Sequence, residues 1–222
     1  MIDTDWLVLR GLVSSLSGAF SKYVDRGTRL LDFGCGTMPY RSMVEARGGK
    51  YVGADFGSDA AIEITPDGQV GANDGSIDVV LSVQVLEHVR DLDRYFSEIS
   101  RVLDQGGRLI LSTHGTWLYH PHPEDHRRWT RMGLHHEIES RGFKIESSEA
   151  IVGPLAWTTM IRSTGFAFAL RNIPLVGRLL QAVVSLVMNM RAWAEDAITP
   201  EAIRTENACV YLVVATKRES AS

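Results

Sequence analysis

The sequence predicts an α/β fold built on a doubly wound, mostly parallel sheet of seven strands. Short apolar runs alternate along the chain with segments whose apolar residues recur at helical spacing, which is typical of parallel sheets with right-handed crossovers. The expected strands are residues 29–33, 50–54, 61–64, 77–83, 108–113, 143–150 and 209–216. The expected helices are residues 5–24, 86–103 and 132–140, and we expect Gln105-Gly106-Gly107 to turn the chain after the second of them.

The composition fits one globular domain with an elaboration. The 222 residues are 45% hydrophobic and 23% charged, with a net charge of −4, so nucleic acid is not an expected partner. Two cysteines far apart in sequence and no signal-peptide pattern favour a cytoplasmic protein. The expected divisions are an N-terminal helix (1–27), a ligand-binding domain (28–152 with 204–218) and an apolar helical insertion before the last strand (153–203).

The first expected strand runs straight into two glycines. The segment Leu31–Tyr40 reads LDFGCGTMPY, and glycines here allow a tight turn and close approach to a ligand. A dinucleotide site would favour a third glycine where Pro39 stands, so the loop argues against a bound pyrophosphate and a dehydrogenase. An ordinary glycine turn of an α/β protein remains the alternative.

A carboxylate ends the second expected strand. Asp55 follows Gly36 by 19 residues, and a carboxylate there can accept hydrogen bonds from both hydroxyls of a ribose. The alternative is a solvated acid at a strand terminus. The next residue, Phe56, is placed to pack on an adenine ring.

Three ordered motifs give the sequence a specific resemblance. They are Leu31–Pro39, the run from Asp74 through Val85-Leu86-Glu87-His88-Val89, and Arg101–Gly107. With them, the chain resembles the Rossmann-like class I S-adenosylmethionine-dependent methyltransferases, in the type 11-like branch of quinone-biosynthesis and small-molecule enzymes. The resemblance covers about residues 28–150 and returns with the last strand near 208–217.

The resemblance implies S-adenosyl-L-methionine as cofactor and S-adenosyl-L-homocysteine as product. It implies that Asp32, Gly34, Cys35 and Gly36 surround the methionine part and that Asp55 and Phe56 hold the ribose and adenine. Further cofactor contacts implied are Asp67 and Gly68 at the adenine edge, Ser82, Val83 and Gln84 beneath the cofactor, and His88 near its amino-acid end. Met38 departs from the glycine that many relatives carry there.

A histidine-rich loop follows the fifth expected strand. Four of the seven histidines lie between His114 and His126, and an imidazole there could deprotonate a hydroxyl or amine acceptor. His114 is the first candidate base and His120 the second. The candidate substrate contacts are Tyr119, Asp125, Arg128 and Trp129, with Arg127 as an alternative to Arg128 for an anionic group.

Two other interpretations of this loop stay open. His120, His122 and His126 with Glu124 or Asp125 would be a metal site, but prolines separate the histidines and we expect no metal. In the second, Asp125 and Trp129 only pin the loop. The loop carries His-Gly, Tyr-His-Pro, Pro-x-Asp and Arg-Trp-Thr in this order, and this pattern resembles methyltransferases of sugar and surface-polysaccharide pathways.

The insertion contains an unusually wide apolar arc. In residues 173–190 the polar side chains fall on one narrow stripe, and an arc this wide exceeds what one face of a soluble domain requires. Three roles fit: a lid, a homodimer interface, or peripheral contact with a membrane and a lipid-linked substrate. We favour a lid or interface, and expect no spanning helix because the chain must return for its last strand.

The function expected from the sequence is methyl transfer to a small-molecule acceptor, at a hydroxyl of a sugar or related polar metabolite. One alternative is a carbon or nitrogen methyltransferase acting on a quinone-like or lipid-linked acceptor. Another is a non-catalytic cofactor-binding partner subunit.

Overall fold

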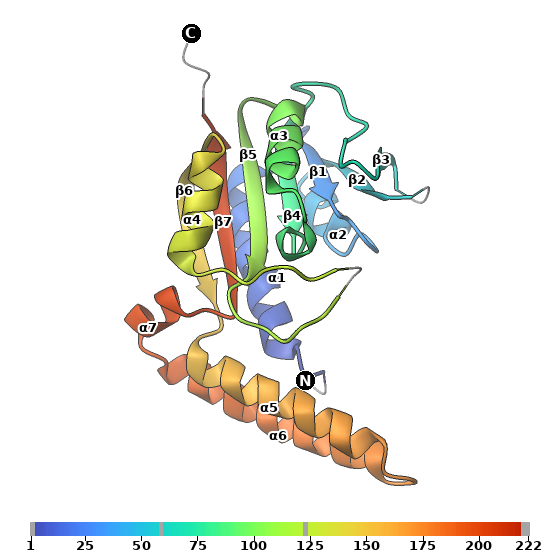
Figure 1. The fold of residues 1–222 in the computed structure, drawn as a ribbon, viewed down its shortest axis with the longest axis vertical. Coiled ribbons are helices and arrows are strands. Elements are labelled where there is room, and N and C mark those ends of the chain that lie inside the picture. The colour runs from blue at the N-terminus through green and yellow to red at the C-terminus, as the bar shows by residue number, and fades with distance from the viewer. Residues whose placement is uncertain (1–2, 58–59, 122–123, 219–222) are drawn as a thin grey trace.

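The computed structural model describes residues 3–57, 60–121 and 124–218, and these form a seven-stranded sheet flanked by helices (Figure 1). The strand order is β3-β2-β1-β4-β5-β7-β6, with β7 antiparallel to both of its neighbours. The strands are β1 (Arg29–Phe33), β2 (Lys50–Phe56), β3 (Ile62–Ile64), β4 (Ile77–Val83), β5 (Leu103–His114), β6 (Phe143–Ile151) and β7 (Val210–Lys217). This mixed, mostly parallel sheet confirms the predicted fold class.

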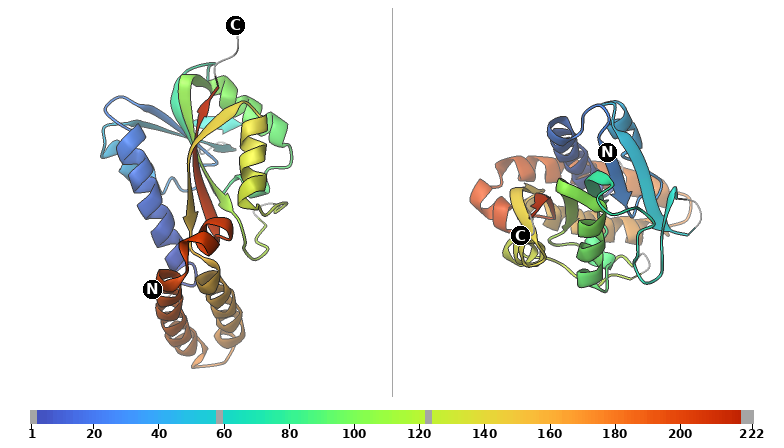
Figure 2. Two further views of the ribbon diagram at one scale, coloured as in Figure 1. Left: turned by 90° about the vertical axis from the view of Figure 1, so that its left-hand side faces the viewer. Right: turned by 90° about the horizontal axis from the view of Figure 1, so that it is seen from above.

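Helices cover both faces of the sheet, as the left view of Figure 2 shows. α1 packs on one face through Leu12, Leu16 and Phe20, while α3 and α4 cover the other through residues such as Phe96 and Ile138. The helices are α1 (Trp6–Tyr23), α2 (Arg41–Glu45), α3 (Leu92–Val102), α4 (Arg131–Ser140), α5 (Pro154–Arg171), α6 (Gly177–Ile198) and α7 (Glu201–Glu206), with a short 3-10 helix η1 (Leu86–His88). Two buried cores therefore hold the sheet between two helical layers.

The predicted helix over residues 86–103 is two elements in the structure. η1 ends at His88, and α3 begins only at Leu92 because extended Asp91 caps it, accepting a hydrogen bond from Arg94 N at 3.0 Å. The turn predicted at Gln105-Gly106-Gly107 lies inside β5 instead, since this strand already begins at Leu103. The break at residues 89–91 leaves η1 free to contribute to the loop cluster at the sheet edge.

The sequence order of the strands reverses beside β1. Because β1 pairs in parallel with β2 on one side and β4 on the other, the loops after these three strands meet at one edge of the sheet. In open α/β sheets this is where ligands bind. β5 and β6 also end there, because β6 is antiparallel to β7 and β7 to β5.

An antiparallel helical hairpin leaves the sheet at the same edge. α5 follows the end of β6, and α6 returns through α7 to the start of β7, so the pair projects away from the sheet (Figures 1 and 2). Within the described ranges, none of the helices is both long enough and apolar enough to cross a membrane.

Gly115 sets how closely the loop after β5 approaches β7. A Cβ at this position would lie 2.5 Å from the Ala208 carbonyl oxygen and 2.7 Å from the Tyr211 ring. Because one of these atoms is backbone, we expect Gly115→Ala to lower the free energy of unfolding by about 1–3 kcal/mol in urea titrations. Gly18→Ala is the matched control: a Cβ there meets nothing within 4 Å in α1, so stability should rise by about 0.5–1 kcal/mol. Equal stability of the two variants would contradict this packing argument.

Candidate functional site

The loops after β1, β2 and β4 pack directly on one another. Gly34 has a φ of 77°, and a Cβ on it would lie 2.6 Å from Val85 Cγ2 in the loop after β4. The backbone N–H of Gly36 donates to Asp55 Oδ2 at 2.8 Å, and the N–H of Phe56 donates to the other oxygen of the same carboxylate at 2.8 Å. The three strand ends predicted to hold the cofactor thus form one continuous surface.

Asp32 is a buried carboxylate at the base of this surface. It is 2% exposed and accepts a short hydrogen bond of 2.5 Å from the Tyr51 hydroxyl. Burial and, to a lesser extent, the Asp55 charge raise the pKa of Asp32 to about 6, against the opposing effect of the Tyr51 hydrogen bond. A cation bound beside Asp32 would restore the ionised carboxylate.

Two residues other than glycine adopt left-handed backbone in these loops. Met38, after β1, and Gln84, after β4, both have a φ of 57°. The Gln84 amide donates to Ser112 Oγ at 3.0 Å, while its Oε1 atom is buried with no hydrogen-bond partner among the described residues. Strained backbone and an unused buried acceptor are both characteristic of binding sites.

Other predicted cofactor contacts differ in how they face the crevice. The Ser82 hydroxyl accepts a 2.7 Å hydrogen bond from Tyr95 on α3, so this side chain points into the helical layer, and Val83 is partly buried. Cys35 is buried and packs closely on β2, because a Cβ added to Gly53 would lie only 2.8 Å from the Cys35 sulfur. Cys35 therefore fills the interior of the loop.

The predicted adenine-side residues are exposed. Phe56 is 65% exposed at the end of β2. Asp67 lies in a turn with Gly68, where it accepts a 2.6 Å hydrogen bond from Thr65 and lies 3.5 Å from the Arg94 guanidinium on α3. The structure places this turn beside β3 rather than in the packed loop cluster.

Three imidazoles gather at the end of β5. The His114 ring lies 5.0 Å from the His120 ring, and the His120 ring lies 5.1 Å from the His88 ring. His88 Nδ1 contacts the Glu124 carbonyl oxygen at 2.5 Å, which fastens the histidine-rich loop to η1. The structure therefore brings both predicted bases together with the predicted cofactor contact His88.

The two candidate bases have different environments. His114 is 7% exposed, stacks on Trp117, and has Nε2 3.6 Å from Glu87 Oε1. Burial, together with the neighbouring His120 and Arg128 charges, lowers the pKa of His114 to about 3. Burial also lowers the pKa of His120, against the opposing effect of Asp125. Both rings are therefore neutral at physiological pH.

Asp125 and Arg128 form an ion pair inside the loop. Arg128 donates to both carboxylate oxygens, at 2.5 and 2.7 Å, and also to the carbonyl oxygens of Trp117 and Leu118. The pair holds the pKa of Asp125 well below its usual range. Since these contacts and that to the Arg127 carbonyl occupy the guanidinium, Arg128 would have to rearrange to bind a substrate anion.

The remaining predicted substrate contacts differ widely in their exposed fractions. Tyr119 is 75% exposed, whereas Trp129 is 8% exposed, belongs to the core and donates its backbone N–H to the His114 carbonyl at 3.2 Å. Arg127 donates to the carbonyl oxygens of Val89 and Arg90. Tyr119 is therefore the residue of this group that is free to meet a substrate without repacking.

The residues that could hold a metal ion differ from those that the sequence suggested. His126 contacts Glu124 at 3.1 Å, and His122 lies outside the described residues. In the part of the chain that the structure describes, Glu87, His114 and His120 form the group whose potential ligand atoms lie within 4.8 Å of one another. Glu87 Oε1 is buried and has no hydrogen-bond partner there.

Sequence reasoning missed two polar residues of the site. Tyr51 holds Asp32, and Glu87 is fully buried beneath His114, with its second oxygen accepting a 2.8 Å hydrogen bond from Thr113. Glu87 stands inside the quoted Leu-Glu-His motif, so a signal for it was present. Tyr51 lies inside a strand, and no sequence pattern distinguishes it from a packing residue.

Comparison with known proteins identifies sequence relatives among methyltransferases. Residues 9–151 match the model of a methyltransferase domain family. A probable S-adenosylmethionine-dependent methyltransferase of Mycolicibacterium smegmatis is 33% identical over 81 residues, which is 34% of this chain and 32% of that protein. A methyltransferase of Mycobacterium sp. strain KMS is 33% identical over 48% of this chain and 46% of its own length. The match thus spans less than half of either relative.

Solved structures share the fold. A phosphoethanolamine N-methyltransferase of Haemonchus contortus, solved with S-adenosylhomocysteine, superposes with a TM-score of 0.58 at 15% identity, over 92% of this chain and 53% of that one. A SAM-dependent methyltransferase of Archaeoglobus fulgidus superposes with a TM-score of 0.56 at 15% identity, over 94% of both chains. Because the family model matches residues 9–151, more than half of the chain, the chain belongs to the methyltransferase domain family.

Proposed function

We propose that the protein transfers the methyl group of S-adenosylmethionine to a hydroxyl of a sugar or related polar metabolite. The observation that carries this proposal is the cluster of His114, His120 and His88 at the end of β5, in which burial keeps His114 and His120 neutral. A neutral imidazole can take the proton that a hydroxyl loses as it is methylated. The sugar-pathway resemblance of the loop sequence supports the choice of acceptor.

The residues of the crevice fit the cofactor. The buried, unpartnered Gln84 Oε1 offers an acceptor, Asp32 offers a carboxylate for the cofactor's ammonium group, and Asp55 is positioned for the ribose hydroxyls. Bound S-adenosylmethionine supplies an activated methyl group on its sulfonium. The protein's main contribution is placement of the acceptor in line, an effect worth about 7–11 kcal/mol in well-oriented reactions.

We assign the base to His120 and a supporting role to His114. A general base works best when its pKa lies near the working pH, and the pKa of His114, about 3, lies far below it. The His120 side chain is 29% exposed, and its Nδ1 lies 3.5 Å from the buried Asp125 carboxylate, which favours the imidazolium, and 3.4 Å from the Arg128 guanidinium, which opposes it. His114 packs between His120 and Trp117 and holds the ring in place.

The cofactor assignment is tested by binding. We expect S-adenosylmethionine and S-adenosylhomocysteine to bind in calorimetry and NAD not to bind. Asp55→Ala should weaken both affinities by about tenfold or more, because it removes a charge-assisted acceptor from the ribose and from Gly36 N. Glu63→Ala, an exposed carboxylate on neighbouring β3, is the matched control. Unchanged binding by the Asp55 variant would remove Asp55 from the site.

The pKa of Asp32 predicts how cofactor affinity depends on pH. Because the ammonium group prefers the ionised carboxylate, affinity should be constant above pH 6 and fall about tenfold per pH unit below it. Calorimetry from pH 5 to pH 8 measures this profile. Asp32→Asn should bind more weakly and lose this pH dependence. A wild-type profile that stays flat down to pH 5 would refute an ammonium contact at Asp32.

The base assignment predicts that substitutions of two histidines in the same loop affect kcat differently. With an acceptor identified from a panel of glycosides by radiolabelled methyl transfer, His120→Ala should lower kcat by about 10²–10⁴-fold and leave cofactor affinity unchanged. His126→Ala, whose ring contacts Glu124, serves as the matched loop control and should retain kcat. If His114→Ala proves the more severe variant, with cofactor affinity intact, the base belongs at His114 instead.

A further inference from the structure

The α5–α6 hairpin buries small and polar residues where its helices meet. The buried residues of the two helices are Ala156, Thr159, Met160, Ser163 and Ala167 on α5 and Gly177, Ser185, Asn189 and Ala192 on α6, and all but Met160 are small or polar. The polar stripe seen in the sequence of α6 therefore points inward at Ser185 and Asn189. Close helix packing through small residues is typical of helices in an apolar surrounding.

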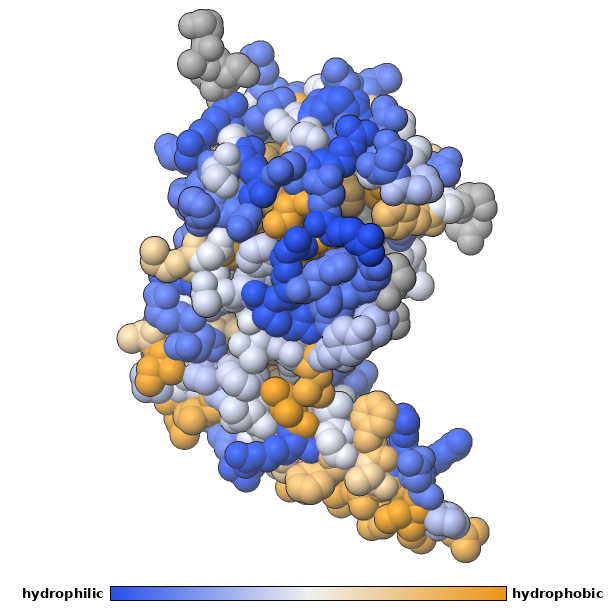
Figure 3. Space-filling view, viewed as in Figure 1, coloured by the Kyte–Doolittle hydropathy of each residue, from blue (hydrophilic) through white to orange (hydrophobic). Residues whose placement is uncertain are grey.

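The outward face of the hairpin carries the large apolar side chains. Fourteen of the twenty-one large exposed apolar side chains in the described part of the chain lie between Leu155 and Ile198. On α6 they form a stripe at helical spacing through Leu179, Val183, Val187 and Met190, each more than half exposed. Figure 3 shows hydrophobic surface gathered along the projecting hairpin, while the sheet domain above it is mostly hydrophilic on the same side.

The tip of the hairpin is the most exposed part of this surface. Leu175 is 106% exposed and adopts a left-handed φ of 64°, which is rare for a residue other than glycine. Ile173 and Val176 flank it and are 41% and 48% exposed. Just before the tip, the Arg171 guanidinium lies 4.0 Å from the Phe168 ring centroid. An apolar tip beside an arginine on an aromatic ring suits an interface between water and lipid.

The charge of the hairpin selects among possible occupants. The two helices of the hairpin contain four arginines and two acidic residues, Glu195 and Asp196, near the end of α6, where Glu195 pairs with Arg191 at 2.7 Å; the chain as a whole has a net charge of −4. All four of these side chains, Arg162, Arg171, Arg178 and Arg191, are exposed. A second copy of the chain would bring like charges together on this face, whereas a bilayer with anionic lipids offers the opposite charge.

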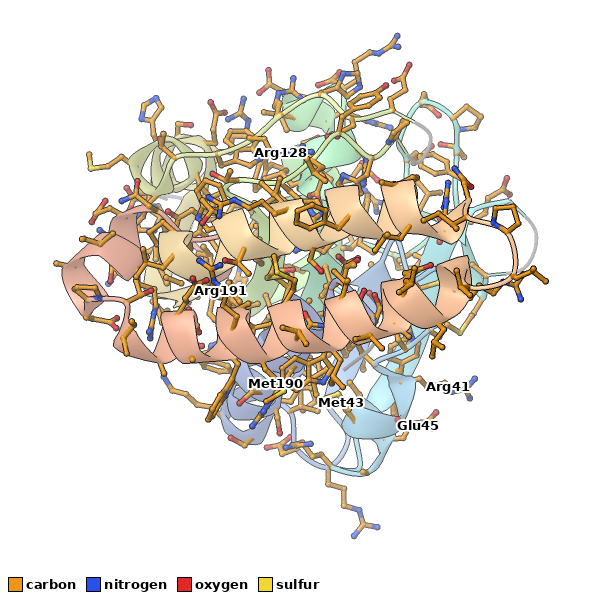
Figure 4. The ribbon with its side chains drawn as sticks, turned by 90° about the horizontal axis from the view of Figure 1, so that it is seen from below. Arg41, Met43, Glu45, Arg128, Met190 and Arg191 are labelled. Carbon is orange, nitrogen blue, oxygen red and sulfur yellow. The ribbon has the colours of Figure 1, made fainter. Side chains whose placement is uncertain are left out.

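The hairpin also has a defined position relative to the catalytic edge. It begins directly after β6 and returns to β7, at the edge where β1, β4 and β5 end. Figure 4, which views the molecule from this end, shows α5 and α6 lying side by side across it, in front of the sheet domain. A surface held by the hairpin would therefore lie at the edge of the sheet where the loops that carry the predicted cofactor contacts meet.

We propose that the α5–α6 hairpin docks on the surface of a membrane containing anionic lipids and that the acceptor is a polar group carried by a lipid at that surface. The outer apolar face lies in the interfacial region, and the arginines meet the lipid phosphates. The acceptor part of this inference rests on the proposed function, whereas the docking part stands independently of it. Docking would present a lipid-borne hydroxyl to His120 at the catalytic edge.

Vesicle binding tests the docking directly. The full chain should float with vesicles of phosphatidylcholine and phosphatidylglycerol, and bind at least about tenfold less to phosphatidylcholine alone. The triple variant Leu179→Ser, Val183→Ser, Val187→Ser should lose at least about tenfold in binding to the anionic vesicles. Met132→Ser, an equally exposed apolar residue on α4, is the matched control and should bind as the wild type does. Unchanged S-adenosylhomocysteine affinity of the triple variant shows that it folds.

A fluorescent label at the tip gives a second, independent readout. Both native cysteines, Cys35 and Cys209, are buried, so Leu175→Cys can be labelled selectively with a polarity-sensitive dye. We expect a blue shift of its emission with anionic vesicles and none for the same dye on Met132→Cys. Removing Arg171 and Arg178 as alanines should weaken anionic vesicle binding by about fivefold for each arginine.

Three results would overturn the inference. They are absence of vesicle binding by a chain that binds S-adenosylhomocysteine, equal binding by the triple serine variant, and a dimer in sedimentation that the triple variant dissociates in the absence of lipid. The last result would identify a second copy of the chain as the occupant. If the wild type binds vesicles but His120→Ala methylates a lipid-borne acceptor at the wild-type rate, the result refutes His120 as the base. It leaves the proposal of membrane docking by the hairpin unchanged.

Discussion

The site depends on the parallel pairing of β1 with both β2 and β4. This pairing aligns Asp32 with Gly53 on one side and with Leu81 on the other, so the loops that follow the three strands meet at one point. The N–H groups of Gly34 and Cys35 then bond to the Ala54 carbonyl oxygen, and that of Gly36 to the Asp55 carboxylate. Each loop is thus fixed by its neighbour as much as by its own sequence.

Burial determines the chemistry available at this edge. The same desolvation raises the pKa of Asp32 and lowers that of His114, so burial shifts both groups toward their neutral forms. The Asp125–Arg128 pair holds the histidine-rich loop rigid without placing a net charge beside the rings. Placement of the substrate and a neutral proton acceptor suit methyl transfer, because the methyl donor is already activated.

The hairpin reverses the usual distribution of polarity. Thr159, Ser163, Ser185 and Asn189 are buried, and large apolar side chains such as Leu179, Val183 and Phe166 are exposed, whereas the sheet domain buries its apolar residues in two cores. Most of the large exposed apolar side chains of the described residues therefore lie on the hairpin, which leaves the sheet at the edge where β1, β4 and β5 end.

The sequence by itself determined the strands, the sheet class, the glycine loop and the family, because these are local patterns: apolar periodicity, a glycine pair after a strand, and a motif at fixed spacing. It did not determine the break in the helix predicted over 86–103, where the Asp91 cap competes with apolar periodicity. Only the tertiary structure placed Tyr51 against Asp32, fixed Arg128 inside its loop and grouped Glu87 with His114, because these contacts join residues brought together by the sheet. Likewise, an apolar arc does not reveal which way it faces, since that depends on what α5 leaves uncovered on α6.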